Sequence, residues 1–62
     1  MIVNVENIRE FVIAYQNKSE LARRAGIDRT YLYRILNGER KPGLKFAEGM
    51  LRAGMKKEDV LN

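Results

Sequence analysis

Residues 17–38 constrain the fold more than any other part of the chain, because capping residues and a stop signal divide them into two short segments. Asn17 and Asp28 are residue types that cap helix starts, and Gly26 tolerates the left-handed backbone at a helix end. Glu20 completes a capping box, in which its carboxylate would reach back to the Asn17 amide. The pattern predicts two helices joined by a tight turn, over residues 18–25 and 29–36.

A further helix is predicted before this pair. Its apolar side chains recur at the i, i+3, i+4, i+7 spacing of one buried helix face: Ile8, Phe11, Val12 and Tyr15. This spacing predicts a helix over residues 5–16, with Asn4 as its N-cap. Residues 1–3 fit a short extended arm as well as they fit the start of that helix.

Two more helices are predicted after the pair. The first covers residues 44–53, and its buried face is expected to hold four apolar side chains, with Phe46 on the flank: Leu44, Ala47, Met50 and Leu51. Gly49 costs about 1 kcal/mol relative to alanine inside a helix and permits a close helix crossing. A short last helix is expected over residues 57–61. The chain is therefore predicted to be all-α, with a compact five-helix domain over residues 1–62.

Composition argues against several classes of function. The chain has 0 cysteines and 0 histidines, so no thiolate or imidazole can act as a nucleophile or metal ligand. It also has no glycine-rich phosphate loop and no paired carboxylates in an expected cleft. We expect no enzyme activity, no cofactor and no metal. Because no apolar run approaches the length of a bilayer and no secretory signal is visible, no membrane association and a cytoplasmic location are expected.

The positive charge is concentrated in one part of the chain. The formal net charge is +4, yet residues 18–45 alone carry +5, with eight basic against three acidic side chains. The flanking segments are close to neutral. A concentrated positive field attracts polyanions, so the helix pair and the loop after it are expected to face a polyanion such as a nucleic acid.

The motifs in this region resemble the lambda-repressor-like family of Cro-type helix-turn-helix DNA-binding domains, also described as the xenobiotic-response-element family. The resemblance covers nearly the whole chain and is carried by Leu21-Ala22, Gly26-Ile27, and Ile35-Leu36-Asn37-Gly38 followed by basic residues and Pro42. It implies a helix-turn-helix at the second and third helices. The implied recognition helix, residues 28–36, lies in the DNA major groove. Lys18 stands where the family often has glutamine.

Two sets of DNA-contacting residues are predicted. The base-reading set shares one face of the third helix, opposite Leu32 and Ile35: Arg29, Thr30, Tyr33 and Arg34. The DNA-backbone set lies at helix ends and in the following loop: Lys18, Tyr31, Asn37, Gly38, Arg40, Lys41 and Lys45. Alternatives remain open for both sets. The arginines can instead neutralise phosphates or pair with Asp28 and Glu39, the tyrosines can be half-buried supports, and the basic loop can be a solvated surface.

These residues predict a sequence-specific transcriptional regulator, and the resemblance to small Cro-like proteins implies a repressor of phage or mobile-element type. It would act in the bacterial nucleoid or a phage-infected host. One small reading domain covers few base pairs, so a homodimer on a palindromic operator is expected. The candidate dimer residues are apolar and late in the chain, with core packing as their alternative role: Met50, Met55, Val60 and Leu61. The rival function is binding of a partner protein, as an antirepressor or antitoxin does.

Overall fold

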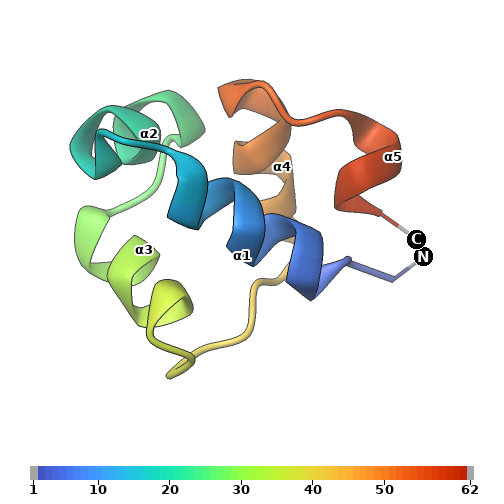
Figure 1. Cartoon of the computed structure of the whole chain (residues 1–62), viewed down its shortest axis with the longest axis horizontal. Helices are drawn as coiled ribbons and strands as arrows, with labels where there is room; N and C mark the ends of the chain where they lie inside the picture. The colour runs from blue at the N-terminus through green and yellow to red at the C-terminus, as the bar shows by residue number, and fades with distance from the viewer. Residues whose placement is uncertain (1, 62) are drawn as a thin grey trace.

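Five helices follow one another in the computed structural model, which describes residues 2–61 (Figure 1). They are α1 (Val5–Ala14), α2 (Lys18–Ala25), α3 (Arg29–Leu36), α4 (Leu44–Ala53) and α5 (Lys57–Val60). The predicted all-α fold, with its helix-turn-helix at the second and third helices, is confirmed. The predicted ends of two helices were too late in the chain. The first helix was expected to reach residue 16, but α1 ends at Ala14 and the backbone is already extended at Tyr15. The last helix was expected to reach residue 61, but Leu61 forms an isolated antiparallel bridge with Val3.

The predicted N-caps are confirmed at the first three helices. The side-chain oxygens of Asn4, Asn17 and Asp28 accept from the amides of the first helical turns at 3.0, 3.1 and 2.9 Å. Each cap satisfies one of the backbone donors that a helix start leaves without a partner. The second half of the expected capping box is wrong, because the Glu20 carboxylate accepts from Arg23 and Arg24 instead.

One face of every helix packs into the hydrophobic core. Its largest fully buried side chains are Phe46, Ile8, Leu21, Leu32, Ile35, Met50, Val12 and Val60. The expected buried face of α4 needs correction: Phe46 is 0% exposed, whereas Leu44 is 64% and Leu51 36% exposed. The inward face of α4 runs through Phe46, Ala47, Gly49, Met50 and Ala53 instead.

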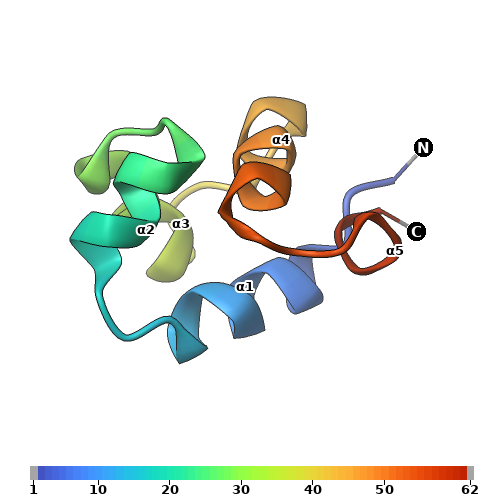
Figure 2. The ribbon, with the colours of Figure 1, turned by 90° about the horizontal axis from the view of Figure 1, so that it is seen from above.

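A close approach between α2 and α4 explains this rotation. A Cβ atom built on Gly49 would lie 2.7 Å from the Ala25 carbonyl oxygen, closer than real side chains come. Only glycine therefore fits at this point of the crossing, and α4 must turn position 49 toward α2. The close crossing predicted at Gly49 is confirmed, and Figure 2 shows α2 and α4 side by side.

The late apolar residues pack inside the molecule. Met50 and Val60 are each 0% exposed, so they cannot form the expected dimer surface while this fold is intact. Met55 and Leu61 are half-buried and pack against the same core. Their alternative role, core packing, is the one that the structure supports. The amide of Asn4 also donates to the Val60 carbonyl over 2.8 Å, which fastens α5 beside the start of α1.

The helix pair and α5 occupy opposite ends of the molecule. In Figure 1, α2 and α3 form the left end, and α5 and the segment leading into α1 form the right end. None of the helices within residues 2–61 is long and apolar enough to cross a membrane.

Candidate nucleic-acid interface

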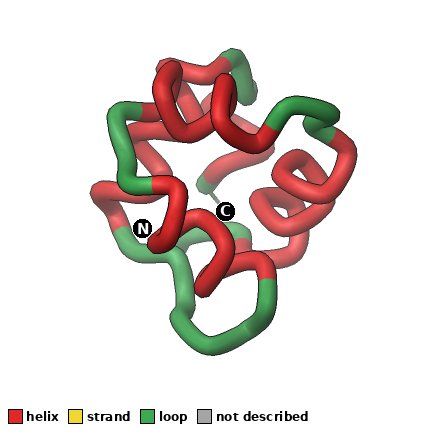
Figure 3. The backbone as a smooth tube through the Cα atoms, turned by 90° about the vertical axis from the view of Figure 1, so that its left-hand side faces the viewer, coloured by secondary structure: helices red, strands yellow, loops and turns green. Residues whose placement is uncertain are grey.

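The turn between α2 and α3 sets the angle at which α3 is presented. Gly26 takes a left-handed backbone with φ of 70°, and the Ile27 amide donates to the Ala22 carbonyl over 3.0 Å. Ile27 is half-buried and packs against the core, so its side chain fills the space beneath the turn. Figure 3 shows the molecule from the end formed by α2 and α3, which face the viewer.

The outer face of α3 holds the four predicted base-reading residues together. Arg29, Thr30, Tyr33 and Arg34 are all exposed, and Tyr33 is 42% exposed. Leu32 and Ile35 on the opposite face are buried in the core. The helix therefore offers two guanidinium groups, a hydroxyl and a phenol to solvent while its back is fixed by packing.

The two arginines of this face differ in how they are held. The Nη1 atom of Arg29 donates to the Ser19 hydroxyl oxygen of α2 over 2.9 Å. The Arg34 guanidinium makes no hydrogen bond or ion pair with any residue between 2 and 61. Neither arginine pairs with Asp28 or Glu39, which was the alternative to DNA contact.

The two tyrosines of α3 have different surroundings. The Tyr31 ring is half-buried and meets the Phe46 ring edge-on, with centroids 5.6 Å apart. Its ring thus supports α3 against α4, as the alternative reading proposed, and DNA contact through its hydroxyl stays a prediction. Tyr33 has no such support and stands on the exposed face.

The loop after α3 adds an exposed cationic segment. Asn37, Gly38, Arg40, Lys41 and Lys45 are all exposed. The Gly38 amide donates to the Ile35 carbonyl over 3.1 Å, so it is already used within the chain. Backbone contact to DNA through these five residues stays a prediction.

Three basic side chains, Arg9 from α1 and Arg40 and Lys41 from this loop, line a small hollow beside the loop. It measures about 170 Å³ and is lined by Val5, Arg9, Ile35, Gly38, Arg40, Lys41 and Pro42. No carboxylate lines it, and Val5, Ile35 and Pro42 give it an apolar floor. Arg9 was missing from the sequence-based set, because only the packing of α1 against α3 brings it beside Arg40 and Lys41.

Three basic side chains bind the carbonyl ends of other helices. The Lys18 ammonium donates to the Ile13 and Tyr15 carbonyls at the end of α1. Arg52 donates to the Ala25 carbonyl of α2 over 2.8 Å, and Arg9 to the Leu36 carbonyl of α3 over 3.2 Å. A cation at a helix C-terminus satisfies free carbonyls and complements the helix dipole. The Lys18 ammonium thus has a structural role, and its predicted phosphate contact remains untested.

The outer side of α2 carries a local charge cluster. Glu20 lies between Arg23 and Arg24, with Nη2 of Arg23 2.5 Å and Nε of Arg24 3.2 Å from the same carboxylate oxygen. The hydrogen bond from Arg23 is the largest cause that lowers the pKa of Glu20 below its ordinary 4.5, and Arg24 adds to it. The same contact raises the pKa of Arg23. These two arginines are therefore neutralised in part within α2.

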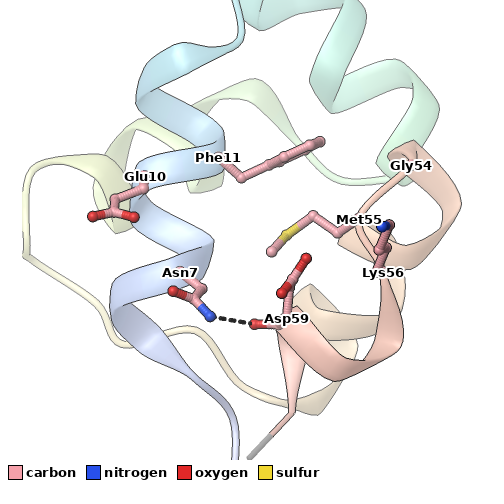
Figure 4. Close-up of a pocket in the computed structure, with 7 residues that line it drawn as sticks. All are labelled: Asn7, Glu10, Phe11, Gly54, Met55, Lys56 and Asp59. Atoms are coloured by element: carbon pink, nitrogen blue, oxygen red, sulfur yellow. Dashed lines mark hydrogen bonds between the residues drawn. The ribbon is translucent and has the colours of Figure 1, made fainter.

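A second and larger hollow lies between α1 and the turn before α5 (Figure 4). It measures about 470 Å³ and is lined by Asn7, Glu10, Phe11, Gly54, Met55, Lys56 and Asp59. Its lining residues include two acidic residues and one lysine, and the Asn7 amide group donates to the Asp59 carbonyl over 3.1 Å. This charge is unfavourable for a phosphate, whereas the smaller hollow beside Arg40 carries only cations.

The fold and the exposed cationic face of α3 define a helix-turn-helix DNA-binding domain. Residues 16–59, which make up most of the chain, match the model of a helix-turn-helix family. The chain belongs to this lambda-repressor-like family, whose members are typically DNA-binding transcriptional regulators and not enzymes. The match begins just before α2 and therefore does not include α1. The resemblance inferred from the motifs was expected to cover nearly the whole chain, α1 included. Searches of curated proteins and of solved structures return no match.

Proposed function

We propose that this protein is a sequence-specific transcriptional regulator that places α3, with its cap at Asp28, in the major groove of double-stranded DNA. The observation that carries the proposal is the outer face of α3. Its four exposed polar side chains are backed by a buried face, in a chain that belongs to a DNA-binding family.

The roles of the base-reading residues follow from their donor groups. Arg29 and Arg34 each bind a guanine through O6 and N7, which is worth about 1–3 kcal/mol of discrimination for a well-formed pair. Thr30 contacts a thymine methyl group or donates to a base edge. Tyr33 lies one turn after Arg29 and contacts the groove wall with its ring and a base or phosphate with its hydroxyl.

The backbone set holds α3 in register without reading sequence. It comprises Lys18, Tyr31, Asn37, Gly38, Arg40, Lys41 and Lys45, to which we add Arg9. The hollow formed by Arg9, Arg40 and Lys41 has the charge and the size to seat one phosphate. If about six phosphates are neutralised, affinity falls about 10³-fold between 50 and 200 mM salt.

We further propose that the protein is a Cro-like repressor that binds a palindromic operator as a homodimer. A single α3 contacts only a few base pairs, and two copies on half-sites about 34 Å apart read enough sequence to be selective. Action in the bacterial nucleoid or a phage-infected host, and a phage or mobile-element origin, belong to this proposal by analogy with small Cro-type regulators. A role mainly in binding a partner protein is the weaker candidate, because it leaves the exposed Arg34 without a function.

The experiment compares two variants that lose the same charge. Arg34→Ala removes a cation from the outer face of α3, and Arg24→Ala removes one that Glu20 partly neutralises on α2. We expect Arg34→Ala to change the base preference at one operator position and to weaken binding about 10-fold or more, within the range of one bidentate pair. Arg24→Ala should leave the preference unchanged. Equal effects of the two variants would contradict the assignment of α3 as the reading helix.

A further inference from the structure

We propose that Ser19 is a positioning residue for base recognition, whose hydroxyl holds the Arg29 guanidinium in one orientation on the DNA-facing side. The inference rests on the proposed DNA-reading function. Ser19 is the second residue of α2 and Arg29 the first residue of α3, so their contact joins the starts of both helices. The Nη1 atom of Arg29 donates to the Ser19 Oγ over 2.9 Å, and both residues are exposed.

This contact fixes which edge of the guanidinium remains available. A guanidinium has five N–H donors in a rigid plane. Ser19 occupies one donor of Nη1, whereas Nε and Nη2 of Arg29 have no partner among residues 2–61. Two parallel donors along one edge suit the O6 and N7 acceptors of guanine. Ser19 therefore directs Arg29 to approach a guanine through its Nε–Nη2 edge.

The neighbouring polar side chains are engaged elsewhere, so Ser19 is the residue that can orient the Arg29 guanidinium. Lys18 is directed away from α3, because its ammonium binds the carbonyl end of α1. Glu20 is occupied by Arg23 and Arg24. Asp28 uses a carboxylate oxygen to cap α3 at the Thr30 amide. Within the described chain, Ser19 alone hydrogen-bonds the Arg29 side chain.

An anchored arginine binds with a smaller loss of rotamer freedom than a free one. Because the bond between Ser19 and Arg29 is exposed to water, its effect on affinity is expected to be modest, about 3- to 10-fold. The effect should appear only on DNA that Arg29 reads. It should not alter the fold, because Ser19 is exposed and alanine is a better helix former than serine.

The test uses four variants of the full chain: Ser19→Ala, Ser19→Thr, Arg29→Ala and the Ser19→Ala/Arg29→Ala double variant. Binding is measured by fluorescence anisotropy to the duplex that the wild-type protein selects and to a scrambled duplex, at one salt concentration. We expect Ser19→Ala to weaken the selected duplex about 3- to 10-fold and leave the scrambled duplex unchanged. Ser19→Thr, which keeps a hydroxyl, should restore the affinity. In the Arg29→Ala background, Ser19→Ala should have no further effect.

Three results would overturn the role of Ser19. An equal loss on both duplexes, or a Ser19→Ala effect that persists without Arg29, would make Ser19 a direct phosphate contact. A neutral Ser19→Ala on a duplex that wild type selects would refute the positioning role and leave the DNA-reading function standing. If wild type selects no duplex, the proposed function itself fails.

A measurement without DNA tests the same contact independently. The ¹⁵N–¹H heteronuclear NOE of the Arg29 Nε group reports how rigid the guanidinium is in the free protein. We expect a rigid group in wild type and in Ser19→Thr, and a mobile group in Ser19→Ala. Equal mobility in all three proteins would show that Ser19 does not hold Arg29.

Discussion

Replacing Gly49 by alanine tests the helix crossing that fixes α4 against α2. In an open helix this substitution stabilises by about 1 kcal/mol, because alanine restricts the unfolded chain more than glycine does. Here the new Cβ atom would lie 2.7 Å from the Ala25 carbonyl oxygen and 3.1 Å from the Ala25 Cβ. The obstacle is backbone on a packed helix, so α2 and α4 must separate to accept the methyl group.

The magnitude follows from two opposing effects. Overpacking a close contact costs about 1–3 kcal/mol. Separation of the helices also strains the hydrogen bond of 2.8 Å from Arg52 to the Ala25 carbonyl, which is worth about 1 kcal/mol. These two costs exceed the gain in helix propensity. We therefore expect Gly49→Ala to destabilise the protein by about 1–2 kcal/mol. In a domain of this size each kcal/mol lowers the melting temperature by about 4–8 °C.

The assay is thermal and urea unfolding followed by circular dichroism. Gly43→Ser is the matched control, because a side chain at Gly43 meets nothing within 4 Å and α4 has no side-chain N-cap there. We expect this control to be stabilised by a few tenths of a kcal/mol. A Gly49→Ala protein at least as stable as wild type would refute the close approach of α4 to Ala25.

Three further substitutions test other parts of the account. Lys41→Ala should weaken binding to all duplexes alike and lower the slope of log affinity against log salt by about one, in titrations at several salt concentrations; a sequence-selective loss contradicts a phosphate role. Arg52→Met should lower the free energy of unfolding by about 1 kcal/mol in urea titrations, because the Ala25 carbonyl loses its donor; an unchanged midpoint contradicts this capping role. Glu20→Gln should lower stability at neutral pH. The pKa of Glu20 is depressed in the folded state, so its contribution is complete above the ordinary value of 4.5 and is lost as the pH falls through the folded value. The stability difference from wild type should therefore disappear in acid, and a difference that persists there contradicts the ion-pair explanation.

Local signals were sufficient for the helix pair and for the exposed face of α3. The caps at Asn17 and Asp28 and the stop at Gly26 depend on side-chain and backbone chemistry within a few residues. They therefore gave the bounds of α2 and α3 correctly. Once these bounds are known, the helical period determines which residues lie opposite Leu32 and Ile35.

Contacts between distant residues could not be derived in this way. The rotation of α4, which buries Phe46 and exposes Leu44, depends on how closely Gly49 approaches α2. Arg9 joins the cationic hollow only because α1 packs across α3. A periodic pattern of apolar residues specifies that a helix has a buried face, but the neighbouring helix decides where that face is centred.

Selection of bound duplexes from a random DNA library near physiological salt tests the central claim most directly. If α3 reads bases, sequencing should yield an enriched site, and a homodimer should make that site palindromic with half-sites one helical turn apart. A library that is not enriched, with binding only at low salt, would contradict sequence-specific recognition and favour a function that depends on a partner protein.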